Sequence, residues 1–193
     1  MPARHPDVSI PLPARWLMTD ERLGDTLWRA LEALPRGSGV VFRHFDTALP
    51  MRRVLFDRLL RLARRKGLIL IRAGAERMIG EMGIHGPGRL PVGGIRTWSA
   101  HSRREAIAGK RAGADLIFVS PIFPTRTHPG AASLGPVRAA LMTKGLGTKC
   151  IALGGMNPSR GRRSARLGFY GWAAIDAWQQ PTRKNQKRNA VPI

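Results

Sequence analysis

Two segments of the chain repeat one pattern, in which a short apolar run leads into a polar or glycine-rich loop and then into a helix. The first apolar run is Leu116 to Val119, followed by the polar residues 125–128. The second is Cys150 to Leu153, followed by Gly154-Gly155 and a helix start at Asn157. Strand, loop and helix in this order build parallel α/β folds, whose chemistry lies in the loops beyond the carboxyl ends of the strands.

Three segments together resemble the thiamine-phosphate synthase and thiazole tautomerase family: Gly113-Ala114-Asp115, Ser120 to Thr127, and Ala152 to Met156. The matched part runs from about residue 98 to 177, and a weaker match reaches back to residues 16–20. Members of that family are (β/α)8 barrels, so the resemblance implies an α/β TIM barrel. At 193 residues the chain is short for this fold, where about 250 residues is typical.

The other apolar runs supply the remaining strands of such a barrel. Strands are predicted at Arg15 to Met18, Val40 to Phe42, Leu68 to Ile71, Ile84 to His85, Ile95 to Trp98 and Phe169 to Ile175. Between residues 73 and 94, seven glycines and two prolines leave little room for a full helix, so we expect an abbreviated middle region. We predict an irregular lead-in at 1–14, one barrel domain at 15–178 and a basic, loose tail at 179–193.

The chain is strongly basic, with 33 Lys and Arg against 12 Asp and Glu and a formal charge of +21. The last thirteen residues hold only four of these basic residues, so the charge belongs to the body of the protein. Such a field attracts anions. Because the basic residues are scattered along predicted helices, we expect solvated helix faces and phosphorylated small-molecule substrates, and we do not expect nucleic acid as a partner.

The single cysteine, Cys150, excludes an intramolecular disulfide and a cysteine-built metal site. It lies in an apolar run, where we expect a buried side chain and no nucleophile. No apolar run approaches the ~20 residues of a membrane span, and the proline-rich first 14 residues hold no hydrophobic signal core. We therefore expect a cytoplasmic protein with no membrane partner.

The glycine pair Gly154-Gly155 is the strongest candidate for a phosphate site. Glycines let a phosphate approach backbone N–H groups, and the helix start at Asn157 adds partial positive charge. A tight turn that requires positive φ is the alternative reading of the same two glycines. By resemblance, Thr125 and Thr127 would help to hold the phosphate of a thiazole ligand.

The family's reaction expels pyrophosphate, and the resemblance implies Mg2+ as its cofactor. This chain departs from the family pattern there, because Arg72 and Ala73 replace an asparagine-aspartate pair that serves magnesium. At the end of the second strand, family members carry a glutamine, an arginine and a lysine, and this chain keeps only the arginine, as Arg43. We therefore hypothesise that Arg43, Arg72 and either Arg89 or Arg96 clamp an anion in place of the metal. Surface or salt-bridged arginines in an inactive homologue are the alternative.

Further candidates follow from the same resemblance. Ser99 stands where the family has a serine that meets pyrophosphate, and with Arg43 and His128 it completes the predicted catalytic set. His128 replaces a lysine and is cationic only part of the time at neutral pH. Asp176 replaces a small hydroxyl residue and would repel phosphate unless it pairs with an arginine.

Three functions remain open. The resemblance favours a thiamine-phosphate synthase-like transferase, since the tautomerase branch places its acid–base histidine where this chain has Pro121. In a tautomerase or other phosphate-ligand isomerase, His85, His101 or His128 would have to serve as the base. A catalytically inactive basic binding protein is the third reading. Family members are often homodimers, so the resemblance also implies a dimer.

Overall fold

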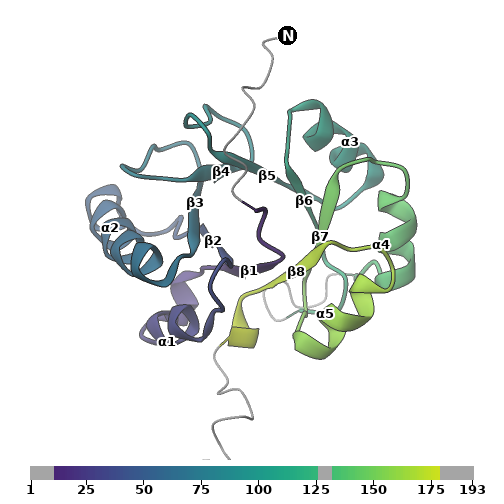
Figure 1. Ribbon diagram of the computed structural model, residues 1–193, viewed down its shortest axis with the longest axis horizontal. Helices are drawn as coiled ribbons and strands as arrows, with labels where there is room; N and C mark the ends of the chain where they lie inside the picture. Colours follow the sequence, from purple (N-terminus) through teal and green to yellow (C-terminus); the bar gives the residue numbers. More distant parts are fainter. Residues whose placement is uncertain (1–10, 126–131, 179–193) are drawn as a thin grey trace, which may run out of the picture.

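The computed structural model describes residues 11–125 and 132–178, which form a closed barrel of parallel strands in sequence order (Figure 1). The strands are β1 (Arg15–Met18), β2 (Gly39–Phe42), β3 (Ile69–Ala73), β4 (Gly83–His85), β5 (Ile95–Ala100), β6 (Leu116–Val119), β7 (Lys149–Leu153) and β8 (Gly171–Ala174). Strand β1 pairs with both β2 and β8, which closes the ring. The predicted TIM barrel is confirmed, and each predicted strand is present with ends that differ by at most two residues.

The outer layer is incomplete within the described residues. Its helices are α1 (Thr26–Ala33), α2 (Leu49–Lys66), α3 (Arg103–Arg111), α4 (Pro136–Thr143) and α5 (Pro158–Ala165), with 3-10 turns η1 (Glu21–Leu23) and η2 (Asp176–Trp178). Residues 74–82 and 86–94, which connect β3 to β4 and β4 to β5, contain no helix. The predicted abbreviation of the middle region is confirmed, and its glycines and prolines are the physical reason.

The barrel wall has an apolar face on each side. Inward-facing side chains form a cluster that contains only strand residues at its centre, and in it the rings of Trp16 and Phe118 meet edge to face at 5.3 Å. Gly39 pairs with Trp16, and a Cβ there would lie 2.2 Å from the Trp16 ring, so glycine makes room for it. Outward-facing residues such as Leu17 and Ile117 pack in the cluster shared with the helices. Burial on both faces explains the continuous apolar runs of the sequence.

Side chains at the helix starts fix where the helices begin. Ser102 Oγ accepts from the N–H of Glu105 at 3.2 Å, and the Glu105 carboxylate accepts from the N–H of His101 at 2.9 Å. These two contacts form a capping box in which the glutamate reaches one residue further back than the cap. The predicted first helix is split, since Leu23 ends η1 and Gly24 separates it from α1.

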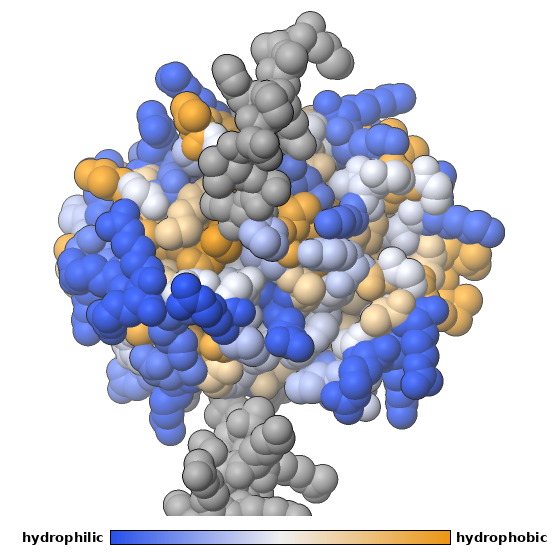
Figure 2. All heavy atoms as spheres, in the orientation of Figure 1, coloured by the Kyte–Doolittle hydropathy of each residue, from blue (hydrophilic) through white to orange (hydrophobic). Residues whose placement is uncertain are grey.

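Arginines of the helices form much of the basic surface. Figure 2 shows strongly hydrophilic residues around the outer edge of this face of the molecule, including the side of α2. The exposed basic residues of α2 are Arg53, Arg58, Arg61, Arg64 and Arg65. This arrangement agrees with the expected solvated helix faces.

The predicted tail at 179–193 lies outside the described residues, as does most of the predicted lead-in at 1–14. Among the helices that are described, none combines the length and the apolar character that crossing a bilayer requires.

Candidate functional site

The loops after β6 and β7 lie against each other at the carboxyl ends of the strands. The N–H of Ile122 donates to the carbonyl of Leu153 at 2.8 Å, and the N–H of Phe123 donates to that of Gly154 at 3.2 Å. The segments that carry the two predicted phosphate-binding motifs are therefore joined by backbone hydrogen bonds at one mouth of the barrel.

Both glycines of the β7 loop are required by this contact. Gly154 and Gly155 have φ values of +94° and +59°, which L side chains rarely adopt. A Cβ on Gly154 would lie 2.8 Å from Cα of Pro121, and one on Gly155 would lie 2.6 Å from the carbonyl oxygen of Pro124. The tight-turn reading is thus correct for the backbone, since both glycines adopt positive φ in a close contact between the two loops.

The glycine pair of this loop offers two backbone N–H donors. Within the part of the chain that the structure describes, no acceptor is bonded to the N–H of Gly154 or Gly155. Helix α5 begins just beyond, where Asn157 caps it by accepting from the N–H of Arg160 at 2.9 Å. The Arg160 guanidinium bonds the carbonyl of Gly155 and lies 4.3 Å from the ring centre of Phe123. Arg160 therefore ties the two loops together.

A cavity of about 220 Å³ opens beside these loops. Its lining comes from the ends of β2, β5, β6, β7 and β8, and consists of Arg43, His101, Ser120, Pro121, Pro124, Thr125, Leu153, Gly154, Gly155, Met156, Ala174, Ile175 and Asp176. Four residues predicted from the sequence, Arg43, Thr125, Gly154 and Gly155, thus face one cavity. Two others, Ser99 and Arg72, are not part of its lining.

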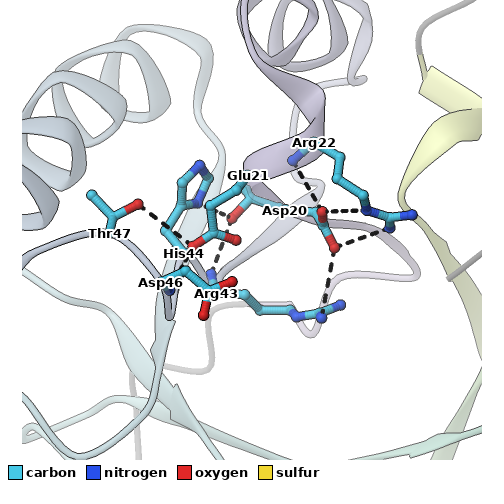
Figure 3. A network of polar contacts seen from close by, with 8 residues as sticks. Asp20, Glu21, Arg22, Arg43, His44, Asp46 and Thr47 are labelled. Carbon is cyan, nitrogen blue, oxygen red and sulfur yellow. Dashed lines mark hydrogen bonds and ion pairs between the residues drawn. The ribbon is translucent and has the colours of Figure 1, made fainter. Parts of the chain in front are cut away.

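An acidic residue at the end of β1 orients Arg43 (Figure 3). The Asp20 carboxylate takes two hydrogen bonds from Arg22, at 2.7 and 3.1 Å, and lies 3.8 Å from the Arg43 guanidinium. The side-chain hydrogen bond from Arg22 lowers the pKa of Asp20, and the charge of Arg43 lowers it further. Asp20 is therefore an anion at neutral pH that holds Arg43 while leaving it at the cavity wall.

The backbone around Arg43 is fixed by neighbouring side chains (Figure 3). Thr19 Oγ1 accepts from the N–H of Arg43 at 3.0 Å and contacts Nδ1 of His44 at 2.9 Å. His44 has a φ of 27° and is buried, and burial lowers its pKa. Glu21 accepts from the N–H of Asp46 at 3.0 Å, which secures the same loop from its other end.

Ser99 lies in a hydrogen-bonded row across β4 and β5. Nε2 of His85 is 2.8 Å from Ser99 Oγ, and Nδ1 of His85 is 2.7 Å from Thr97 Oγ1. Burial, together with the charge of Arg43, lowers the pKa of His85 to about 4, so this imidazole is neutral at physiological pH. Because the charge of Arg43 acts on His85, Arg43 links this row to the cavity.

The placement of Arg72 contradicts its predicted role as an anion clamp. Arg72 pairs in register with Phe42 and Ile84, residues on the outward face of the wall. Its Nε lies 2.5 Å from the Glu81 carboxylate, and both side chains are buried. This ion pair fills space where the helix between β3 and β4 is missing, so the charge of Arg72 is already neutralised away from the mouth. Arg96 donates to the carbonyl oxygens of Gly86 and Gly88, at 3.0 and 2.9 Å, and is not part of the cavity lining.

The residues present do not fit a magnesium site. Mg2+ requires oxygen ligands, usually carboxylates. No group of three or more His, Cys, Asp or Glu suited to a metal occurs in the described ranges, and the end of β3 offers Arg72 and Ala73. The Arg52 guanidinium bonds the carbonyl of Ala73 at 2.7 Å, which adds positive charge where the cation would lie. The magnesium that the resemblance implied therefore has no matching ligand set here.

Two cavity residues carry chemistry that the sequence left open. His101 Nδ1 lies 2.8 Å from the carbonyl oxygen of Ser120, which can only accept, so Nδ1 carries the proton and Nε2 a lone pair. The hydrogen bond to Asp20 raises the pKa of Arg22, and the charge of Asp176 adds to this effect. Two further candidates, Thr127 and His128, lie outside the described residues.

Sequence reasoning missed the positioning roles of Asp20 and Arg160. Asp20 caps η1, and its contact with Arg43 across 23 residues leaves no local signal in the sequence. Arg160 is the third residue after the helix cap Asn157. A long side chain at this position can fold back onto the preceding loop, and this spacing was the signal that the sequence offered.

Comparison with known proteins gives consistent results. The family model described as thiamine monophosphate synthase matches residues 89–178. A thiamine-phosphate synthase of Chloroflexus aurantiacus is 30% identical over 179 residues, covering 84% of this chain and 83% of that protein. One from Geobacillus thermodenitrificans is 37% identical over 81 residues, which cover 41% of this chain and 37% of the relative. The solved structure of a thiamine phosphate pyrophosphorylase from Pyrococcus furiosus superposes with a TM-score of 0.71 at 21% identity, covering 91% of each chain, and supports the fold.

Proposed function

This chain belongs to the thiamine-phosphate synthase family, and on that premise we propose that it joins 4-amino-2-methyl-5-hydroxymethylpyrimidine diphosphate to a thiazole phosphate. In this reaction the thiazole nitrogen forms a bond to the methylene carbon of the pyrimidine. The bond from that carbon to the diphosphate oxygen breaks, and the electron pair leaves with pyrophosphate. Membership of the family supports a role in thiamine biosynthesis.

One observation carries the proposal: Gly154 and Gly155 line the same cavity as Thr125 and Arg43. The amides and the start of α5 would bind the thiazole phosphate, with Thr125 beside them. Arg43 would face the diphosphate, where a fixed cation offsets the charge that develops on the leaving group. Ser99 would donate a further hydrogen bond from the neighbouring row. Since Asp20 and Thr19 fix Arg43 in advance, this cation needs little reorganisation during the reaction.

Incubation of the purified protein with both precursors tests the proposal, with thiamine phosphate measured by chromatography. We expect product with the wild type and at least about a hundredfold slower turnover with Arg43→Met, the magnitude expected when one preorganised donor to a transition-state charge is removed. Arg65→Met, at an exposed position on α2, is the matched control and should leave turnover unchanged. Equal rates in the two variants would exclude Arg43 from the reaction.

A proton-shifting isomerase is the second candidate, and the orientation of His101 favours it. Its Nδ1 proton is held by the Ser120 carbonyl, so a basic Nε2 belongs to a residue of the cavity wall. His101→Asn keeps a donor for that carbonyl but removes the base. Loss of solvent deuterium uptake by a bound thiazole phosphate in this variant, with no synthase product from the wild type, would favour the isomerase.

A further inference from the structure

Thr97, His85 and Ser99 form a row of hydrogen bonds, and the available donors and acceptors determine which group donates to which. Each contact between neighbours is short, at 2.7 Å from Thr97 to Nδ1 of His85 and at 2.8 Å from Nε2 to Ser99. A neutral imidazole has one N–H and one lone pair, so the row can run in two ways. In one, Thr97 donates to Nδ1 and Nε2–H donates to Ser99. In the other, Ser99 donates to Nε2 and Nδ1–H donates to Thr97.

Burial of Thr97 decides between the two. Thr97 has no exposed surface, and its hydroxyl makes no other hydrogen bond within the ranges described. If His85 donated to Thr97, the threonine proton would remain buried without an acceptor, which costs about 1–3 kcal/mol. In the opposite direction every buried proton is bonded, and the proton left over is that of Ser99, which is partly exposed.

We propose that His85 is a positioning residue, whose Nε2–H donates to Ser99 Oγ and turns the Ser99 O–H outward as a hydrogen-bond donor for an anionic oxygen of the ligand. This rests on the proposed function, since it assumes a diphosphate at the mouth. Because Nε2 already carries a proton, it cannot take one from Ser99. The pair is therefore an anion-binding device and not a nucleophilic serine with a base.

The surroundings hold His85 in this state. The Phe118 ring meets the imidazole edge to face at 5.3 Å, and Arg43 supplies the charge that acts on it. Burial is the main cause of the lowered pKa of about 4, and the charge of Arg43 adds to it, so His85 stays neutral across the physiological range. The direction of the row should therefore not change between about pH 8 and pH 5.5.

Nitrogen-15 NMR of the full-length protein, labelled at histidine, tests the direction without a ligand. Long-range correlations distinguish a protonated from a bare ring nitrogen, and the His85 signal is assigned by its loss in His85→Gln. We expect a protonated Nε2 and a bare Nδ1 for His85 from about pH 8 to 5.5. A protonated Nδ1 would overturn the inference.

Two substitutions at His85 test the consequence for binding. The amide nitrogen of Gln can occupy the position of Nε2, whereas the shorter Asn reaches only that of Nδ1. By calorimetry with inorganic pyrophosphate, His85→Gln should bind within about twofold of wild type. His85→Asn and Ser99→Ala should each bind about tenfold more weakly, the effect of one lost charge-assisted hydrogen bond.

The outcomes separate the two proposals. Equal weakening in His85→Gln and His85→Asn, with folding intact, would overturn the positioning role. Wild-type protein that shows the Nε2–H signal but does not bind pyrophosphate would overturn the proposed function and leave the direction of the row standing. If neither variant folds, the His85 signal is assigned instead by elimination, from the signals lost on substitution of the other four histidines, and the tautomer of the wild type still decides.

Discussion

Replacing Gly155 by alanine adds two separate costs at the mouth of the barrel. Its φ of +59° lies in the left-handed region, which costs an L residue about 1–2 kcal/mol. The new Cβ would also lie 2.6 Å from the Pro124 carbonyl oxygen and 2.9 Å from Cβ of Phe123. Forcing a carbon into a packed contact costs a further 1–3 kcal/mol or so. We therefore expect Gly155→Ala to lower the free energy of unfolding by about 2–5 kcal/mol.

Gly93→Ala is the matched control, because it carries the first cost without the second. Gly93 has a φ of +67°, and a Cβ there would meet nothing within 4 Å. Urea denaturation of this variant should show a loss of only about 1–2 kcal/mol. The difference between the two variants then measures how closely the loops after β6 and β7 approach each other. Equal losses would refute the packing described for this mouth.

Binding should separate the two variants as well. Relief of the clash in Gly155→Ala must move the segment of Phe123 and Pro124, and Thr125 moves with it. We expect affinity for a thiazole phosphate to fall at least about tenfold in calorimetry, and to stay unchanged in Gly93→Ala. Unchanged affinity in a Gly155→Ala protein that shows the expected loss of stability would refute the proposal that this loop binds the phosphate.

Three other predictions concern Arg160, Asp20 and Cys150. Arg160→Met should weaken binding of a thiazole phosphate about three- to tenfold in calorimetry, because it removes the contacts that hold the two loops together. The free energy of unfolding should fall by less than about 1 kcal/mol in urea denaturation, because the buried apolar residues stay in place. A larger loss of stability than of binding free energy would contradict this. The pKa of Asp20 is lowered in the folded state, so its carboxylate should add about 1 kcal/mol to the free energy of unfolding relative to Asp20→Asn. This contribution should be present above about pH 5 and vanish as the pH falls through the folded pKa. Urea denaturation at several pH values checks the trend, and a difference between the two proteins that does not change with pH would reject it. Burial raises the pKa of Cys150 to about 11, so iodoacetamide at pH 8 should leave it unmodified in native protein and label it in urea, as mass spectrometry can show.

The strands were predictable because parallel strands buried on both faces read as continuous apolar runs. Leu116 to Val119 has the predicted bounds for this reason, with Ile117 facing the helices and Phe118 facing the barrel interior. The missing helices between residues 73 and 95 were also legible, since glycine and proline oppose helix formation.

The sequence could not predict in the same way which face of the barrel wall an arginine side chain occupies. Where both faces of a strand are buried, the pattern of apolar residues does not tell the inner face from the outer one. The resemblance groups Arg72 with Arg43 because both stand where the family binds its metal and anion. Arg72 needed its partner Glu81, which comes from a loop whose irregular course the sequence does not specify.

Strand register explains why Arg43 lies at the mouth of the barrel whereas Arg72 is buried on the outward face of its wall. Val41 faces the barrel interior and pairs with Ile71, whereas Phe42 faces the helices and pairs with Arg72. Arg43 follows Val41 by two residues and lies at the cavity wall, held by an acid at the end of β1. Asp20, which follows the neighbouring strand β1, therefore anchors the cation Arg43 at a mouth where the end of β3 offers Arg72 and Ala73 in place of carboxylates. Removal of Asp20 should then weaken pyrophosphate binding through Arg43, even though Asp20 itself is an anion.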